Sequence, residues 1–276
     1  MSAPRKWKGN VLGILCAAAS LVPVVGAGAD GLTLARDGKS DYVIVVPDRA
    51  TPVENTAAAE LRHLLEQVTG ATWQVAAERT APADAPRVVV GDGALTRKLL
   101  PDLDVRKLAP DAIVVKTVGR DLVLVGHPRR GTLYAVYTFL EDTVGVRWWT
   151  MDEATVPRRP TLVIPRLDVA YAPKVRDRAT RYLQLSDGCF TSHSRVTKQE
   201  QRQMGVFSTR LRLNGHDHYS IPAEYGGPNG LVGWVHTFYQ INGLLPPKKY
   251  FKEHPDWYSL VKGKRVNLHG QLCLTN

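Results

Sequence analysis

The residue types best suited to chemistry gather in the last third of this 276-residue chain. Five of the eight histidines lie between positions 216 and 269, and aromatic side chains lie among them. These aromatic residues are Trp234, Phe238, Tyr239, Tyr250, Phe251, Trp257 and Tyr258. An aromatic ring stacks on the apolar face of a pyranose, and hydrogen-bonding side chains meet its hydroxyl groups. The mixture favours a saccharide site, although each ring taken singly would more often fill a core.

Two histidines separated by one residue, His216 and His218, would suit a metal ion if they lay on a strand. Residues at i and i+2 of a strand point to the same face, and zinc binds histidine nitrogens together with a carboxylate. The pair follows an expected helix and a glycine, which favours a loop, and no HExxH motif is present. A zinc-dependent hydrolase using these two histidines stays an alternative, and the sequence otherwise indicates no metal site and no cofactor.

Ordinary glycoside hydrolysis needs two carboxyl groups, one acid and one base or nucleophile. The candidates in the second half of the chain are Asp187, Glu200, Glu224, Glu253 and Asp256. None belongs to a convincing pair at a strand end. Glu200 is expected on the solvated face of a helix, and Asp256, after a proline, is expected to cap a turn. The catalytic residues are therefore unknown, and an acid/base pair is expected beyond Asn276.

The elements that position these residues follow an N-terminal targeting segment. Basic Arg5, Lys6 and Lys8 precede an uncharged, mostly apolar run at 11–25, and Ala-Gly-Ala at 27–29 offers small residues for cleavage. The apolar run is shorter than the ~20 residues that span a membrane. Residues 1–29 are therefore predicted to be a signal peptide, which indicates a secreted or periplasmic protein with no stable membrane anchor.

The charge of the mature chain is moderately basic. Three of the 36 lysines and arginines and none of the 26 acidic residues precede position 30, so the mature chain carries about +7. Such a surplus suits acidic polysaccharides or merely a solvated surface, and no nucleic-acid module is visible. Cys189 and Cys273 remain after cleavage, and their spacing leaves open whether they form a disulfide.

Residues 32–168 carry the signals of one α/β domain. The apolar run 42–47 predicts a buried strand, and Thr51 with Glu54 forms a capping box for a helix that Gly70 ends. A second helix is expected at 130–143, ended by Gly145. The other expected strands are 73–75, 88–90, 112–116, 121–125, 146–150 and 162–164, of which 112–116 and 121–125 form an antiparallel hairpin. Together these elements predict a mixed sheet with at least two helices.

The pattern of expected elements changes in residues 173–276, after a cluster of prolines. Strands at 181–185 and 271–274, a helix at 199–211, an extended segment at 231–238, a short helix at 248–254 and a hairpin at 257–266 are expected. Strand followed by helix is typical of a (β/α)8 barrel, which needs ~250 residues. The predicted fold class is therefore α/β, with a small mixed-sheet accessory domain followed by the start of an incomplete barrel, as in a fragment of a longer enzyme.

Several segments together resemble a known group of enzymes. The segments GRDLVLVG at 119–126, RGTLYAVYTFLE at 130–141 and GVRWW at 145–149 resemble the N-terminal accessory domain of family 20 hexosaminidases and family 67 α-glucuronidases. The segments FKEHPDWY at 251–258, GKR at 263–265 and QLCLTN at 271–276 resemble the later signature of an uncharacterised bacterial family in which that domain precedes a barrel. The resemblance covers most of residues 40–276.

The resemblance implies a fold, an activity and a set of binding residues. The accessory domain would be a small sheet with helices on one side, and the barrel would carry the active site at the C-terminal ends of its strands. Arg178, by analogy with arginines at the first strand of related barrels, would hold a sugar hydroxyl or carboxylate, or else form a salt bridge between the domains. His236, Tyr250 and His254 are the further candidates for the sugar pocket.

The resemblance also implies a function. The chain is expected to be part of a secreted glycoside hydrolase-like protein whose partner is an oligo- or polysaccharide, with a uronic acid or N-acetylhexosamine as possible substrate sugars. Residues 1–276 alone are expected to be inactive. A non-catalytic carbohydrate-binding protein remains the other alternative, because fold-level analogy does not establish an activity.

Overall fold

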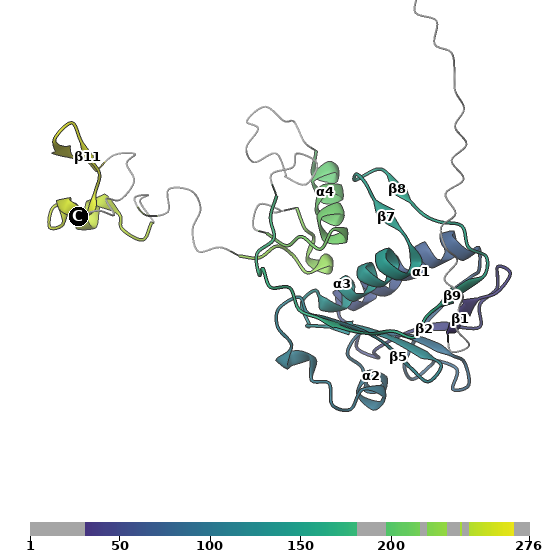
Figure 1. Ribbon diagram of the computed structural model, residues 1–276. Helices are drawn as coiled ribbons and strands as arrows, with labels where there is room; N and C mark the ends of the chain where they lie inside the picture. Colours follow the sequence, from purple (N-terminus) through teal and green to yellow (C-terminus); the bar gives the residue numbers. More distant parts are fainter. Residues whose placement is uncertain (1–30, 181–196, 216–219, 231–237, 239–242, 268–276) are drawn as a thin grey trace, which may run out of the picture.

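The computed structural model describes residues 31–180, 197–215, 220–230, 238 and 243–267 (Figure 1). Several expectations lie outside these residues: the signal peptide, the strands at 181–185 and 271–274, the extended segment at 231–237, and both cysteines of the mature chain. They stay predictions.

A six-stranded mixed sheet forms the centre of the α/β domain, with strand order β10-β5-β6-β4-β2-β3. Its strands are β2 (Val43–Val46), β3 (Gln74–Ala77), β4 (Arg87–Val90), β5 (Ile113–Val118), β6 (Asp121–Gly126) and β10 (Asp168–Tyr171). Strands β2, β3, β4 and β6 run parallel, whereas β5 is antiparallel to both β6 and β10. The predicted α/β fold class with a mixed sheet and the β5–β6 hairpin are confirmed.

Helix α1 (Pro52–Thr69) begins and ends at the residues that the sequence predicts. The amide of Glu54 donates to Thr51 Oγ1 at 3.2 Å, and the amide of Thr51 donates to Glu54 Oε2 at 2.8 Å. This reciprocal box satisfies two amides that the helix itself leaves without acceptors. Gly70 ends the helix with a φ of 73°, a left-handed conformation that glycine adopts without strain.

The second predicted helix forms as two joined pieces. Helix α3 (Gly131–Thr138) continues into a π-helical turn, η2 (Phe139–Val144), and the chain leaves it at Gly145 with a φ of 91°. Every residue of α3 except the last is buried. The turn η2 carries two acidic residues, Glu141 and Asp142.

Alternating residues of the central strands enter two separate cores. In β4, Val88 and Val90 belong to the larger core under α1 and α3, whereas Val89 points to the opposite face. Strand β6 repeats the pattern, with leucines on the first face and Val123 and Val125 on the second. Side chains alternate across a strand, so an unbroken apolar run indicates a sheet that is covered on both faces.

The covering of the second face corrects one implication of the family resemblance. Helices α1 and α3 lie on one side of the sheet, but a short helix α2 (Ala94–Leu99) and a 3-10 turn η1 (Val105–Lys107) lie on the other (Figure 1). Leu95 and Leu99 pack with Val105 against the second core. The helices are therefore not confined to one side, because both faces of the central strands are apolar and need cover.

Two small sheets complete the domain. Strand β1 (Leu32–Ala35) pairs antiparallel with β9 (Leu162–Ile164), which joins the two ends of the domain. Strands β7 (Arg147–Trp148) and β8 (Ala154–Thr155) form a short hairpin after α3. The strand expected at 146–150 is thus only two residues long. The one expected at 73–75 begins one residue later, as β3, because the amide of Trp73 donates to Glu66 Oε1 at 3.3 Å and not to a neighbouring strand.

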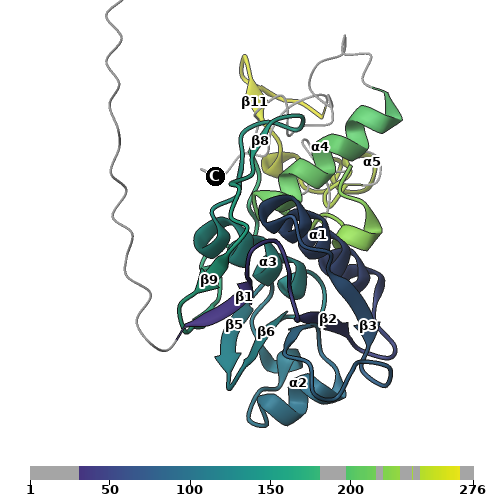
Figure 2. The same cartoon turned by 90° about the vertical axis from the view of Figure 1, so that its right-hand side faces the viewer.

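Beyond the central sheet, the chain packs back onto the same domain. Helix α4 (Lys198–Arg210), predicted at 199–211, lies over α3, and a 3-10 turn η3 (Ala223–Tyr225) contacts α1 (Figure 2). Glu200 caps α4, since its carboxylate accepts from the amide and the hydroxyl of Thr197, both at 2.7 Å. These hydrogen bonds lower the pKa of Glu200, the backbone one most.

The last described segment contains short elements only. Helix α5 (Pro247–Tyr250) covers the first part of the helix expected at 248–254, and a 3-10 turn η4 (Pro255–Trp257) follows it. The helix is shorter than expected because the amides of Glu253 and His254 both donate to the carbonyl of Tyr250, which closes a tight turn and does not continue the helix. Strands β11 (Leu260–Val261) and β12 (Lys264–Arg265) form the predicted hairpin.

Candidate functional site

Asp111 is the centre of a buried network that joins the α/β domain to the segment after it. Its carboxylate accepts from Arg130 Nε at 2.9 Å, from Arg178 Nη2 at 2.8 Å and from the side-chain amide of Asn214. The side chains of Asp111 and Arg130 are each 2% exposed. Burial alone would raise the pKa of Asp111, but the hydrogen bonds and the charge of its partners outweigh burial and lower it.

The loop between β6 and α3 adds a second set of contacts to this network. Arg130 Nη1 donates to the carbonyl of Gly227 at 2.7 Å, and its Nη2 donates to Asn229 Oδ1 at 2.6 Å. Arg129 Nε donates to the carbonyl of Gly226 at 2.9 Å. Two arginines of the domain therefore hold the backbone of residues 226–229.

Two further ion pairs also join the α/β domain to the segment after it. We call the region of these contacts the junction. Arg210 Nη2 lies 3.0 Å from Glu60 Oε2, which also accepts from the hydroxyl of Tyr137 at 3.1 Å. Arg212 pairs with Glu141. Within the described residues, three carboxylates of the α/β domain thus face three arginines that follow it, the third pair being Asp111 and Arg178. The junction is fixed by charge as well as by packing.

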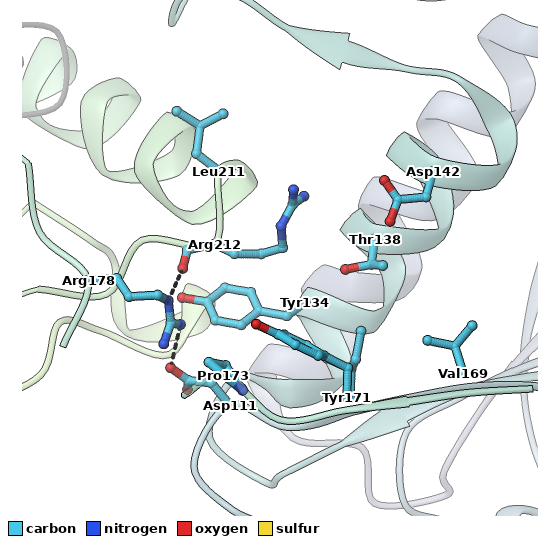
Figure 3. Close-up of a pocket in the computed structure, with 11 residues that line it drawn as sticks. Asp111, Tyr134, Thr138, Asp142, Val169, Tyr171, Pro173, Arg178, Leu211 and Arg212 are labelled. Carbon is cyan, nitrogen blue, oxygen red and sulfur yellow. Dashed lines mark hydrogen bonds and ion pairs between the residues drawn. The ribbon is translucent and has the colours of Figure 1, made fainter. Parts of the chain in front are cut away.

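A cavity of about 510 Å³ opens beside the network (Figure 3). It is lined by Asp111, Ile113, Tyr134, Thr138, Asp142, Val169, Tyr171, Pro173, Arg178, Leu211 and Arg212. The α/β domain supplies its floor and one wall, and the residues after β10 and at the end of α4 supply the other. Small-molecule sites commonly have volumes of ~300–1,000 Å³, so the cavity could hold a sugar residue.

Arg178 lines this cavity, but its guanidinium is already engaged. Besides Asp111, it donates through Nε to the carbonyl of Arg212 at 2.9 Å and through Nη1 to that of Val175 at 2.9 Å. Arg178 therefore forms a salt bridge with Asp111 of the α/β domain, in line with one of its two expected roles. A contact of Arg178 with a sugar stays a prediction.

Tyr250 and His254 come together around Trp257. The His254 and Trp257 rings are parallel within 3° with centroids 3.9 Å apart, and the Tyr250 ring lies 6.0 Å from Trp257. The amide of His254 donates to the carbonyl of Tyr250 at 2.8 Å, which holds the turn. The structure thus assembles two of the predicted binding residues with a third aromatic side chain, while Arg178 belongs to the junction.

The remaining predicted positions lie outside the described residues: His236, and the possible zinc ligands His216 and His218. Among the residues that the structure describes, no three histidine, cysteine, aspartate or glutamate side chains gather as metal ligands would. In the same part of the chain, no helix is long and apolar enough to cross a membrane.

Apart from Arg178, the residues at the centre of the junction were not predicted from the sequence. Asp111 stands just before β5 with a left-handed φ of 61°, and its partners Arg178 and Asn214 follow 67 and 103 positions later. The residues next to an aspartate in the sequence do not indicate contacts with partners so far along the chain. The only available signal was its position, since aspartate tolerates the left-handed conformation better than most residues.

Comparison with known proteins gives a likeness of fold. No family model and no curated protein matches the sequence. Among solved structures, a family GH115 4-O-methyl-α-glucuronidase with specificity for decorated arabinogalactans is similar, with 18% identity and a TM-score of 0.50. The likeness covers 71% of this chain and 29% of that one. This share is larger than residues 1–171 alone make up, so the likeness extends beyond the α/β domain.

Two other solved structures are more distant. CpGH84D has 12% identity and a TM-score of 0.41 over 68% of this chain and 28% of its own. A GH138 enzyme targeting pectin rhamnogalacturonan II has 13% identity and a TM-score of 0.35 over 63% of this chain and 23% of its own. The chain spans less than a third of the length of each of the three proteins. Its fold is similar to that of part of the GH115 4-O-methyl-α-glucuronidase.

Proposed function

We propose that this chain belongs to a secreted glycoside hydrolase-like protein that acts on glycosidic bonds of carbohydrates. The α/β domain at 32–168, with β10 completing its sheet, is the N-terminal accessory domain, and residues 173–276 are the first part of a (β/α)8 barrel. The observation that carries this proposal is the likeness of fold to the 4-O-methyl-α-glucuronidase, which includes residues on both sides of the junction.

The junction supports this assignment. An accessory domain connected only by a flexible linker needs no buried charges. Here Asp111 and Arg130 are buried together and form hydrogen bonds with Asn214 and Asn229. Burying charged groups is costly unless they are paired, so such a network is expected where two parts must keep one relative position. The network would hold the first segments of the barrel in one position relative to the accessory domain.

A uronic acid is the favoured substrate sugar, and an N-acetylhexosamine is the second choice. The GH115 neighbour is described as a glucuronidase, and the mature chain carries a net positive charge that suits an acidic polysaccharide. His236, Tyr250, His254 and Arg178 are proposed to contact the saccharide. No cofactor is needed for hydrolysis by a carboxyl pair.

The catalytic acid and base are proposed to lie beyond Asn276. Two of the carboxylates that were candidates have other roles: Glu200 caps α4, and Glu224 pairs with Arg202 at the surface. Residues 1–276 alone are therefore proposed to be inactive.

The experiment is an assay of the complete gene product on a uronic-acid-decorated arabinogalactan and on aryl glycosides of glucuronic acid and N-acetylglucosamine. Release of a monosaccharide, identified by mass spectrometry, is the expected result, with none released by residues 30–276 alone. Hydrolysis by the 276-residue chain itself would contradict the placement of the acid/base pair. Binding of the polysaccharide without any release would favour a non-catalytic carbohydrate-binding protein instead.

A further inference from the structure

The cavity at the junction has a rim of hydrogen-bonding groups that no described residue uses. Thr138 and Asp142 stand four positions apart, on one face of the helix formed by α3 and η2, and Figure 3 shows both side chains directed toward the cavity. Neither side chain makes a hydrogen bond or ion pair with any residue that the structure describes. The same holds for the hydroxyl of Tyr171, which enters from β10.

Tyr171 gives the cavity an exposed aromatic face. Its side chain is 57% exposed although it lies next to buried Ile113, and Val169 beside it on β10 is 39% exposed. An exposed ring beside an unpaired carboxylate and hydroxyl is the combination that receives a pyranose, because the ring covers the apolar face of the sugar. The carboxylate oxygens can then accept hydrogen bonds from two neighbouring sugar hydroxyls. Such hydrogen bonds to a charged acceptor are stronger than those between two neutral groups.

The charges around the cavity favour an uncharged sugar. Its lining contains two carboxylates, of Asp111 and Asp142, and two guanidinium groups, of Arg178 and Arg212. Both arginines already face carboxylates, Arg178 at Asp111 and Arg212 at Glu141. Asp142 is thus the lining charge that pairs with no described residue, and it would repel a uronate while it accepts hydroxyl groups.

We propose that the junction cavity binds a neutral sugar residue of the polysaccharide, with Tyr171 stacking on its ring and Asp142 accepting from two adjacent hydroxyls. Thr138 supplies a third hydrogen bond. This inference rests on the proposed function for its ligand class, and it adds a second binding site beside the uronic acid that the enzyme would cleave. The accessory domain then has a direct part in holding the substrate.

The test is isothermal titration of the 276-residue chain with methyl β-galactopyranoside and, separately, with methyl β-glucuronide. The galactoside is expected to bind with a dissociation constant on the order of millimolar, as suits one shallow site, and the glucuronide more weakly. Tyr171→Ala is expected to lower the affinity about tenfold or more, and Asp142→Asn about fivefold, while Tyr171→Phe keeps most of it. Circular dichroism of each variant checks that the fold is kept.

Trp149→Ala is the matched control, because Trp149 is 58% exposed on the same domain but does not line the cavity. It is expected to leave binding unchanged. Absence of galactoside binding, tighter binding of the glucuronide, or equal affinities for wild type and Tyr171→Ala would overturn the proposal. If the complete gene product hydrolyses its substrate but the chain does not bind the galactoside, the proposal for the cavity is wrong and the proposed function stands. If the chain binds the galactoside but the complete gene product hydrolyses nothing, the proposed function is wrong and the proposal for the cavity stands.

Discussion

Arg178 Nη2 lies 2.8 Å from Asp111 Oδ2, and this contact joins a residue just before β5 to the chain beyond β10, the last strand of the same sheet. Asp111 is nearly inaccessible and holds Arg130 at the same time. The two arginines and Asn214 together keep an otherwise costly buried charge in place. Among the three described carboxylates that cross the junction, Asp111 is the one that holds two arginines at once.

Asp111→Ala is predicted to destabilise the protein by about 3–5 kcal/mol, because it leaves a buried guanidinium without its counter-charge. Urea denaturation followed by tryptophan fluorescence measures the loss. Asp168→Ala is the control: it removes a surface pair with Lys116 in which Asp168 is 70% exposed, and a change below about 1 kcal/mol is expected. Equal losses for the two variants would contradict the central role of Asp111.

Acid is predicted to weaken the contribution of Asp111. Its pKa in the folded chain lies below the ordinary value of 3.8, so the carboxylate stabilises the folded state fully above about pH 3.8. The contribution is lost as the pH falls through the folded pKa, because the unfolded chain takes up this proton more readily than the folded chain does. The difference in unfolding free energy between wild type and Asp111→Asn should be constant near neutral pH and shrink in acid. A difference that grows in acid would contradict this sign.

The Glu60–Arg210 pair is predicted to couple α1 to the end of α4. Both side chains are mostly buried, at 14% and 23% exposure, and Tyr225 also donates to Glu60. A double-mutant cycle with Glu60→Gln and Arg210→Met should give a coupling energy of about 1–2 kcal/mol. The exposed pair of Asp92 and Arg97 is the control and should give less than about 0.5 kcal/mol.

Two glycines are predicted to differ in how much they tolerate a methyl group. Gly70→Ala meets no atom within 4 Å and suffers only from its left-handed φ, a cost of about 1 kcal/mol. Gly126→Ala would place its Cβ 2.3 Å from the carbonyl oxygen of Ala112 and 2.8 Å from Gly131 Cα, so the β6–α3 turn has to shift. Thermal unfolding should show the larger loss for Gly126→Ala, and the opposite order would contradict the close approach.

Local signals explain what the sequence predicted of the fold. The capping box of Thr51 and Glu54 and the end of α1 at Gly70 depend on residues within one helix. Helix α2 was missed because its cap is not local: Glu78 accepts from the amides of Ala94 and Leu95 at 3.0 and 2.8 Å, from sixteen positions away. Strand β1 was missed for a similar reason, since its partner β9 lies at the other end of the domain.

The candidate site was less predictable than the fold. Aromatic residues at 250–258 suggested a cluster, and Tyr250, His254 and Trp257 do lie together. The junction cavity combines residues from five separate segments, among them Asp142 and Tyr171, and neither belongs to a motif. Composition and spacing cannot indicate which distant side chains meet, because that depends on the packing of the whole domain.

An experimental structure of the complete gene product tests the account most directly. The account predicts that residues 173–276 supply the first strands of a (β/α)8 barrel, with the Asp111–Arg178 contact kept and a carboxyl pair at the C-terminal ends of later strands. A structure in which residues 173–276 close into a compact unit of another architecture would contradict it.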